Sequence, residues 1–171
     1  MKGLLKKKIY DKGFSLIEIL VVIAILGVLV TLVYSAINIA RNKAYTARTL
    51  QEFRAFEQAM FLYLDDFGSY PPDVSRDIPP GIEVYMGGTD WPKGPYPGSV
   101  YDWDNITGAD PYIQISLRFC DISGNNCNFP LEDWAADFDH QSSFYWCFEG
   151  NCRSHPNQPV SHPGYCANCQ N

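Results

Sequence analysis

The longest hydrophobic run of the chain lies close to its N-terminus. Residues 19–40 contain no charged side chain, and at about 1.5 Å per residue they suffice for a helix to cross about 30 Å of hydrocarbon. One carboxylate, Glu18, immediately precedes this run. A charge at the centre of a membrane helix costs about 2.5 to 3.5 kcal/mol. We therefore expect Glu18 to meet a partner charge, to reach the headgroups at the membrane edge, or to be protonated.

A helical pattern continues beyond the apolar run. Apolar side chains recur at steps of three to four residues, with Glu57 as an interruption, so this part predicts an amphipathic helix. The apolar positions are Ala47, Leu50, Phe53, Met60, Leu64 and Phe67. Because no proline occurs before Pro71, the pattern predicts one helix over residues 14–67, and two helices meeting near residues 38–43 are the alternative. Gly68 is the expected end of the helix.

The pattern changes to strand periodicity after the helical part of the chain. Residues 113–119 alternate apolar and polar side chains, which predicts a half-buried strand. Residues 144–148 predict a second strand, and residues 82–85 a weaker third. The amphipathic helix offers the apolar face that such a sheet needs. The fold class is therefore predicted as α+β: a long N-terminal helix, half of it in the membrane, packed on a small antiparallel sheet with a disulfide-rich C-terminal region.

All cysteines of the chain lie in its last third, which predicts disulfides and an oxidising destination. They are Cys120, Cys127, Cys147, Cys152, Cys166 and Cys169. Pairing between sequence neighbours is the first expectation. The alternatives are a zinc site that combines the last four cysteines with His155 or His162, and a redox pair at Cys166 and Cys169.

Charge is distributed unevenly along the chain. Residues 1–13 hold five lysines and one aspartate, a net charge of +4, so the remainder carries −10 of the total of −6. Basic residues before the apolar run favour a cytoplasmic N-terminus. An acidic exported domain repels nucleic acid, which we therefore do not expect as a direct ligand.

The N-terminal segment resembles the N-terminus of type IV pilins and type II secretion pseudopilins. The matching residues are Lys12-Gly13, then Phe14-Ser15-Leu16-Ile17-Glu18, then the apolar residues 19–33. The resemblance implies that a prepilin peptidase cleaves between Gly13 and Phe14, and that Phe14 is then N-methylated. It also implies that Glu18 guides assembly by pairing with the Phe14 amino group of a neighbouring subunit.

This resemblance implies an organisation and a set of partners. The expected parts are a leader peptide (1–13), a transmembrane and assembly helix (14–40), an amphipathic helix (41–67) and a globular pilin-like domain (68–171). The expected partners are identical subunits in a filament, the prepilin peptidase, an inner-membrane assembly platform and an assembly ATPase. The chain would be a single-pass precursor in the cytoplasmic membrane and later an extracellular or periplasmic filament.

Two further functions stay open beside the pilus subunit. The segment Gly68-Ser69-Tyr70-Pro71 resembles the helix exit of major pseudopilins, and residues 91–96 and 101–105 loosely resemble other pseudopilin stretches. A secretion pseudopilin is therefore one alternative, although the cysteine-rich tail favours a surface pilin. The other alternative is a monomeric, signal-anchored extracytoplasmic binding module, for which Glu18 has no role in assembly.

Acidic side chains form the remaining candidate site. Asp102, Asp104 and Asp110 are placed in one loop, and a calcium-holding loop is known in major pseudopilins. We expect calcium as a possible ligand of these three carboxylates, against the alternative that they are turn residues exposed to solvent. No other cofactor is expected. The short segment with Asp139, His140 and Ser142 cannot easily form a hydrolase triad, so we do not expect an enzyme.

Overall fold

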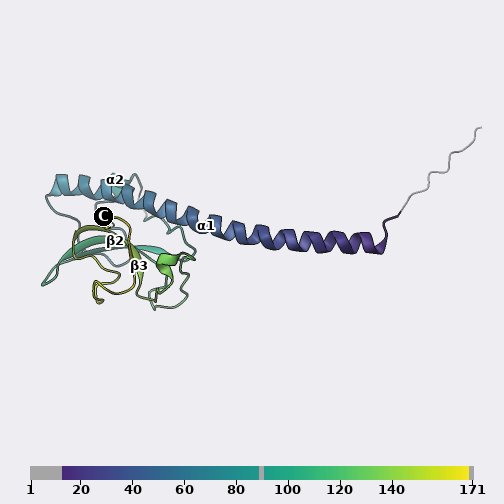
Figure 1. Cartoon of the computed structure of the whole chain (residues 1–171). Coiled ribbons are helices and arrows are strands. Elements are labelled where there is room, and N and C mark those ends of the chain that lie inside the picture. The colour runs from purple at the N-terminus through teal and green to yellow at the C-terminus, as the bar shows by residue number, and fades with distance from the viewer. Residues whose placement is uncertain (1–12, 89–90, 170–171) are drawn as a thin grey trace, which may run out of the picture. The chain divides into compact units, whose positions relative to one another are not determined.

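The computed structural model describes residues 13–88 and 91–169 of the chain (Figure 1). The chain divides into two compact units, Met1–Asn38 and Ile39–Asn171. Helix α1, Leu16–Phe67, is one uninterrupted element that belongs to both units. The prediction of a single helix over residues 14–67 is therefore confirmed with a start two residues later, and the two-helix alternative is wrong.

The part of α1 in the first unit has a bare apolar surface. Every residue from 13 to 37 is exposed, and the most apolar stretch of α1 has a mean hydropathy of 3.1. Among the described residues, α1 alone is long and apolar enough to cross a membrane. An apolar surface of this size is unfavourable in water, so it requires a bilayer or neighbouring apolar helices.

The second unit contains a four-stranded sheet beside the C-terminal half of α1 (Figure 1). In spatial order its strands are β1 (Val100–Ile106), β2 (Tyr112–Arg118), β3 (Ser143–Gly150) and β4 (Tyr165–Cys166). The first three are antiparallel, whereas β4 pairs parallel with β3. The predicted all-antiparallel sheet is thus wrong for β4. A parallel neighbour needs a long connection, which residues 151–164 provide.

An aromatic core joins α1 to the sheet. Phe53 packs edge-to-face on Phe144 with ring centroids 5.4 Å apart, and Phe56 packs in the same way on Tyr101 at 4.8 Å. The other buried hydrophobic residues of this core are Ala59, Met60, Ile82, Tyr96, Trp103, Ile115, Leu117, Phe119 and Trp146. The predicted cover of the sheet by α1 is confirmed.

The buried face of α1 is rotated relative to the predicted stripe. The buried α1 residues are Thr49, Phe53, Phe56, Ala59 and Met60. Ala47 and Phe67 of the predicted stripe are exposed. Thr49 can be buried because its hydroxyl donates to the carbonyl of Tyr45 at 2.9 Å. Glu57 does not disturb the core, because it accepts a hydrogen bond from Trp146 Nε1 at 2.9 Å.

Strand β2 is buried on both faces, so the prediction of a half-buried strand is wrong. Its apolar residues face the α1 side, but Gln114, Ser116 and Arg118 on the other face are also buried. The segment 151–165 covers them, since the carbonyls of Arg153 and Ser154 accept hydrogen bonds from Gln114 and Arg118. A polar face can be buried when its groups are paired in this way.

Two elements differ from the strand prediction. Residues 82–85 do not form a strand, because α2 (Glu83–Met86) is a single helical turn that follows the buried Ile82. Conversely, β1 occupies a region predicted as loop, because its Asp and Asn residues are poor strand formers. Partners on β2 compensate for this poor propensity. A short 3₁₀ helix, η1 (Asp133–Ala135), lies between β2 and β3.

Candidate assembly site

The first turn of α1 is closed by its own side chains. Ser15 precedes the first helical residue, and its Oγ accepts the backbone N–H of Glu18 at 3.3 Å. In return, Glu18 Oε2 accepts the Ser15 backbone N–H and the Ser15 hydroxyl, both at 2.8 Å. This reciprocal pair is a capping box, which satisfies N–H groups that have no partner within the helix. It also fixes the position of the Glu18 carboxylate.

The capping box leaves half of the carboxylate free. Both contacts with Ser15 use Oε2, and Oε1 has no hydrogen-bond partner among residues 13–88 and 91–169. The neighbouring apolar side chains are bare: Phe14 is 82% exposed and Ile17 is 69% exposed. The site therefore presents one negative group within a solvent-accessible apolar surface, which suits a cationic partner that arrives together with another apolar surface.

The predicted processing site lies outside regular structure. Gly13 and Phe14 are exposed and precede α1, so the peptide bond between them belongs to no helix or strand. A peptidase needs such accessible, non-helical backbone. Residues 1–12 of the predicted leader, including Lys12, lie outside the described residues.

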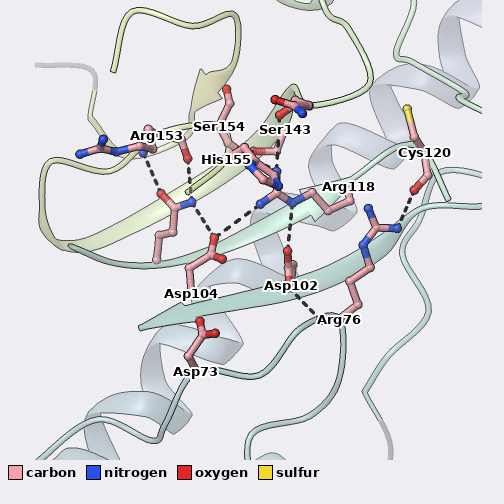
Figure 2. Close-up of polar contacts among 12 residues, drawn as sticks. Asp73, Arg76, Asp102, Asp104, Arg118, Cys120, Ser143, Arg153, Ser154 and His155 are labelled. Atoms are coloured by element: carbon pink, nitrogen blue, oxygen red, sulfur yellow. Dashed lines mark hydrogen bonds and ion pairs between the residues drawn. The ribbon is translucent and has the colours of Figure 1, made fainter. Parts of the chain in front are cut away.

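The second unit contains a buried ionic network that the sequence pattern did not predict (Figure 2). The guanidinium of Arg118 lies 3.1 Å from Asp102 Oδ2 and 3.7 Å from Asp104 Oδ2. The Gln114 amide donates to Asp104 Oδ2 at 2.8 Å. These partners alternate along β1 and β2, where Asp102 pairs with Ser116 and Asp104 with Gln114. Asp102 and Asp104 alternate with apolar residues along one strand, and Gln114, Ser116 and Arg118 do so along the next. This matching alternation was the sequence signal that could have predicted the contact.

Electrostatics of the network follow from its burial. Burial raises the pKa of Asp104 to about 6, although the nearby Arg118 charge opposes this rise. Burial also lowers the pKa of His155, and the positive charge of Arg118 lowers it further. Arg118 links β1 and β2 to the covering segment, because it also donates to the Ser154 carbonyl. The network accordingly holds β1, β2 and the covering segment together.

The three carboxylates of the calcium prediction are not brought together as one ligand set. Asp102 and Asp104 lie on β1 and contact Arg118, whereas Asp110 contacts Arg153 and Asn151. The hydrogen bonds from Arg153 and Asn151 lower the pKa of Asp110. Within the described residues, no group of three or more His, Cys, Asp or Glu side chains could hold a metal ion. The geometry does not favour calcium here, and calcium binding stays a prediction.

The cysteines form three disulfides between sequence neighbours. The pairs are Cys120–Cys127, Cys147–Cys152 and Cys166–Cys169. All six cysteines lie in the described residues and none is free, so no thiolate is left for zinc in this state. The segment 139–142 is a turn in which the Asp139 backbone N–H donates to Ser142 Oγ at 2.9 Å.

Comparison with known proteins agrees with the N-terminal site. Residues 9–34 match the family model described as the prokaryotic N-terminal methylation motif. This motif is the signature of type IV pilins and pseudopilins, and the matched segment contains Gly13, Phe14 and Glu18. No curated protein and no solved structure matched the chain. The chain therefore carries the pilin-type N-terminal segment, which supports a pilin-like or pseudopilin protein.

Proposed function

We propose that the chain is a structural subunit of a type IV pilus or pilus-like filament. The precursor lies in the cytoplasmic membrane through the first half of α1. A prepilin peptidase removes residues 1–13, and the new N-terminal residue, Phe14, is N-methylated. The processed chain then joins other copies through its N-terminal helix to form a filament outside the cytoplasmic membrane. An assembly platform and an assembly ATPase of the inner membrane drive this step.

The observation that carries the proposal is a single carboxylate beside a bare apolar helix. Glu18 is the only charged side chain of residues 14–40, and its Oε1 has no partner among the described residues. In an apolar helix bundle an unpaired charge would cost several kcal/mol, so a filament of such helices needs an opposite charge at this level. Cleavage creates one at the Phe14 amine. This requirement explains why processing must precede assembly.

The first test is the mass of the mature chain. The full chain is co-expressed with a prepilin peptidase, extracted in detergent and measured intact without reduction. We expect a chain that begins at N-methylated Phe14 and is two hydrogens lighter for each of the three disulfides. A chain that still begins at Met1 in the presence of active peptidase would contradict the proposal.

The second test separates assembly from processing. Glu18→Gln keeps the size of the side chain and removes its charge, so we expect normal cleavage and membrane insertion but at least about tenfold fewer filaments. Asp65→Asn is the matched control, because Asp65 is an exposed acid of α1 outside the apolar run. Filaments are counted by electron microscopy and by immunoblotting of sheared material. Normal filament yield from Glu18→Gln would refute the role of Glu18 in assembly, and absence of filaments from the wild-type chain would favour the monomeric binding module instead.

A secretion pseudopilin is the second candidate, favoured by the exit from α1. Gly68 adopts a positive φ of 72° at the end of the helix, which glycine does without strain. The ring of Tyr70 then packs on Phe148 at 5.8 Å, and the Pro71 carbonyl accepts from Trp103 Nε1 at 3.2 Å. This exit is the part that resembles major pseudopilins. Filaments recovered by shearing intact cells support a pilus, and filaments confined to the periplasm support a pseudopilus.

A further inference from the structure

A polar cavity in the second unit is not used by the proposed assembly mechanism. Its volume is about 240 Å³, and it lies between the turn that follows β2 and the segments before and after β3. Arginine and histidine side chains dominate its wall. These are Arg76, Arg118, His140 and His155. The cavity is somewhat smaller than sites for drug-sized ligands, so its size fits a small polar molecule.

Arg76 is the cation of this wall with unused hydrogen-bonding capacity. Its Nη1 donates to the Cys120 carbonyl at 2.9 Å (Figure 2). Its Nε and Nη2 have no partner among residues 13–88 and 91–169, and no carboxylate of these residues lies within ion-pair distance of it. Burial lowers the pKa of Arg76, but an arginine of this kind stays charged at neutral pH. The guanidinium therefore offers two donors and a charge to the cavity.

The backbone of Arg76 is held in a conformation that arginine rarely adopts. Its φ is 53°, in the left-handed region that favours glycine or asparagine. The Arg76 N–H donates to Asp102 Oδ1 at 2.8 Å, which ties this conformation to the buried network. An arginine at such a position costs stability relative to glycine, and this hydrogen bond offsets part of that cost.

The remaining charges of the cavity act on Arg76 from a distance and form no direct ion pair with it within the described residues. Asp121 is the one carboxylate among the described lining residues, and its oxygens are taken up by its own turn. They accept from Ser123 N at 3.0 Å, Asn125 N at 2.8 Å and Asn126 Nδ2 at 2.8 Å. Arg118 is 3% exposed, and its guanidinium is directed to the buried network, with Nε 3.1 Å from Asp102 Oδ2 and Nη2 3.7 Å from Asp104 Oδ2. The wall thus contains one guanidinium, that of Arg76, whose Nε and Nη2 have no partner among the described residues.

We propose that this cavity binds a small oxyanion, namely the carboxylate, phosphate or sulfate group of a small ligand, through Arg76. A planar guanidinium matches the paired oxygens of these groups and can donate two parallel hydrogen bonds to them. Gln141 and His140 line the same cavity and can hold the rest of the ligand. The site belongs to the globular unit alone, so it does not depend on assembly of a filament.

The test is a binding titration of the full chain in neutral detergent micelles. Inorganic phosphate, sulfate and glucuronate are titrated separately by calorimetry at constant ionic strength, with chloride as the balancing ion. We expect saturable one-to-one binding of at least one of the three. Binding of phosphate or sulfate assigns the site to tetrahedral anions, and binding of glucuronate alone assigns it to carboxylates. Absence of saturable binding by all three would overturn the proposal.

Variants locate the binding at Arg76. Arg76→Gln removes the charge and the fork, so we expect affinity to fall at least about tenfold, whereas Arg76→Lys keeps the charge and should lose less. Arg54→Gln, an exposed arginine of α1 remote from the cavity lining, is the matched control and should bind as the wild type does. Unfolding curves verify that each variant is folded, and Arg76→Ala replaces Arg76→Gln if the latter is not. Unchanged affinity in the folded arginine variant would place any binding elsewhere and refute the proposal.

Discussion

At the scale of single residues, Arg118 connects the polar groups that are buried on one face of the sheet. It is almost fully buried and contacts the buried carboxylates of Asp102 and Asp104. Positive and negative groups on that face of the sheet are therefore paired with each other. The same side chain contacts the covering segment through the Ser154 carbonyl. If Arg118 were removed, both carboxylates would stay buried without a counter-charge. The free energy of unfolding would then fall by the desolvation cost that the ion pairs now offset.

We predict that Arg118→Met lowers the free energy of unfolding by about 3 to 5 kcal/mol, because it leaves Asp102 and Asp104 buried without a counter-charge. Urea unfolding of the full chain in detergent, followed by tryptophan fluorescence, measures this change. All four tryptophans lie in the second unit, so the signal reports on that unit. Arg54→Met should stay within about 0.5 kcal/mol of the wild type, and a similar small effect for Arg118→Met would contradict the importance of the network.

A second prediction concerns pH. Because burial raises the pKa of Asp104 to about 6 from 3.8, the folded chain binds this proton more tightly than the unfolded chain does. The contribution of Asp104 to stability therefore increases as the pH falls through about 6 and levels off below 3.8. Asp104→Asn should remove this slope, so the variant gains relative to the wild type as the pH rises from 4 to 7. Parallel stability profiles of the two proteins would refute the pKa assignment, and Asp65→Asn serves as the control.

At the scale of elements, α1 performs two separate tasks along its length. Its first half offers apolar side chains to surroundings other than this chain, and its second half fills the core beside the sheet. The same helical geometry serves both because the apolar residues surround the first half but are restricted to one face in the second. Substitutions in the two halves should therefore affect different measurable properties.

We predict that Phe53→Ala lowers the free energy of unfolding by about 3 to 5 kcal/mol, because Phe53 is fully buried against Tyr101, Phe144 and Trp146. Leu62→Ala changes a residue of α1 that is 53% exposed and should alter stability by less than about 1 kcal/mol. The same urea experiment measures both. Equal effects of the two substitutions would contradict the orientation of α1 on the sheet.

At the scale of the whole molecule, the disulfides are local. The paired cysteines are separated by 7, 5 and 3 residues, so no disulfide connects α1 to the sheet or β1 to β3. By the chain-entropy account, loops this short contribute about 2 kcal/mol each. The overall arrangement thus depends on the aromatic core and the ionic network.

We predict that Cys120→Ala combined with Cys127→Ala lowers the free energy of unfolding by about 2 kcal/mol and leaves the near-UV circular dichroism of the folded chain unchanged. Thermal unfolding with and without reductant measures the effect, and reductant should shift the variant less than the wild type. Loss of the folded signal in the double variant would show that this disulfide determines the fold.

The sequence predicted those parts of the molecule that depend on local patterns. The single helix and strands β2 and β3 follow from periodicity, and the N-terminal motif from a short run of residues. Strand β1 could not be predicted from propensity, because Asp102 and Asp104 are stable in a strand only through their distant partner Arg118. The parallel strand β4 and the cavity at Arg76 also depend on contacts between segments far apart in the chain.

The short disulfides have a mechanical consequence. Each disulfide prevents only the few residues between its two cysteines from being stretched. A force applied to the ends of the globular unit could therefore extend nearly the whole contour length of its chain. Resistance to tension would have to come from non-covalent contacts, namely the aromatic core between α1 and the sheet and the ionic network around Arg118. A fibre made of such subunits would lengthen under load by releasing chain from individual subunits before any covalent crosslink became taut.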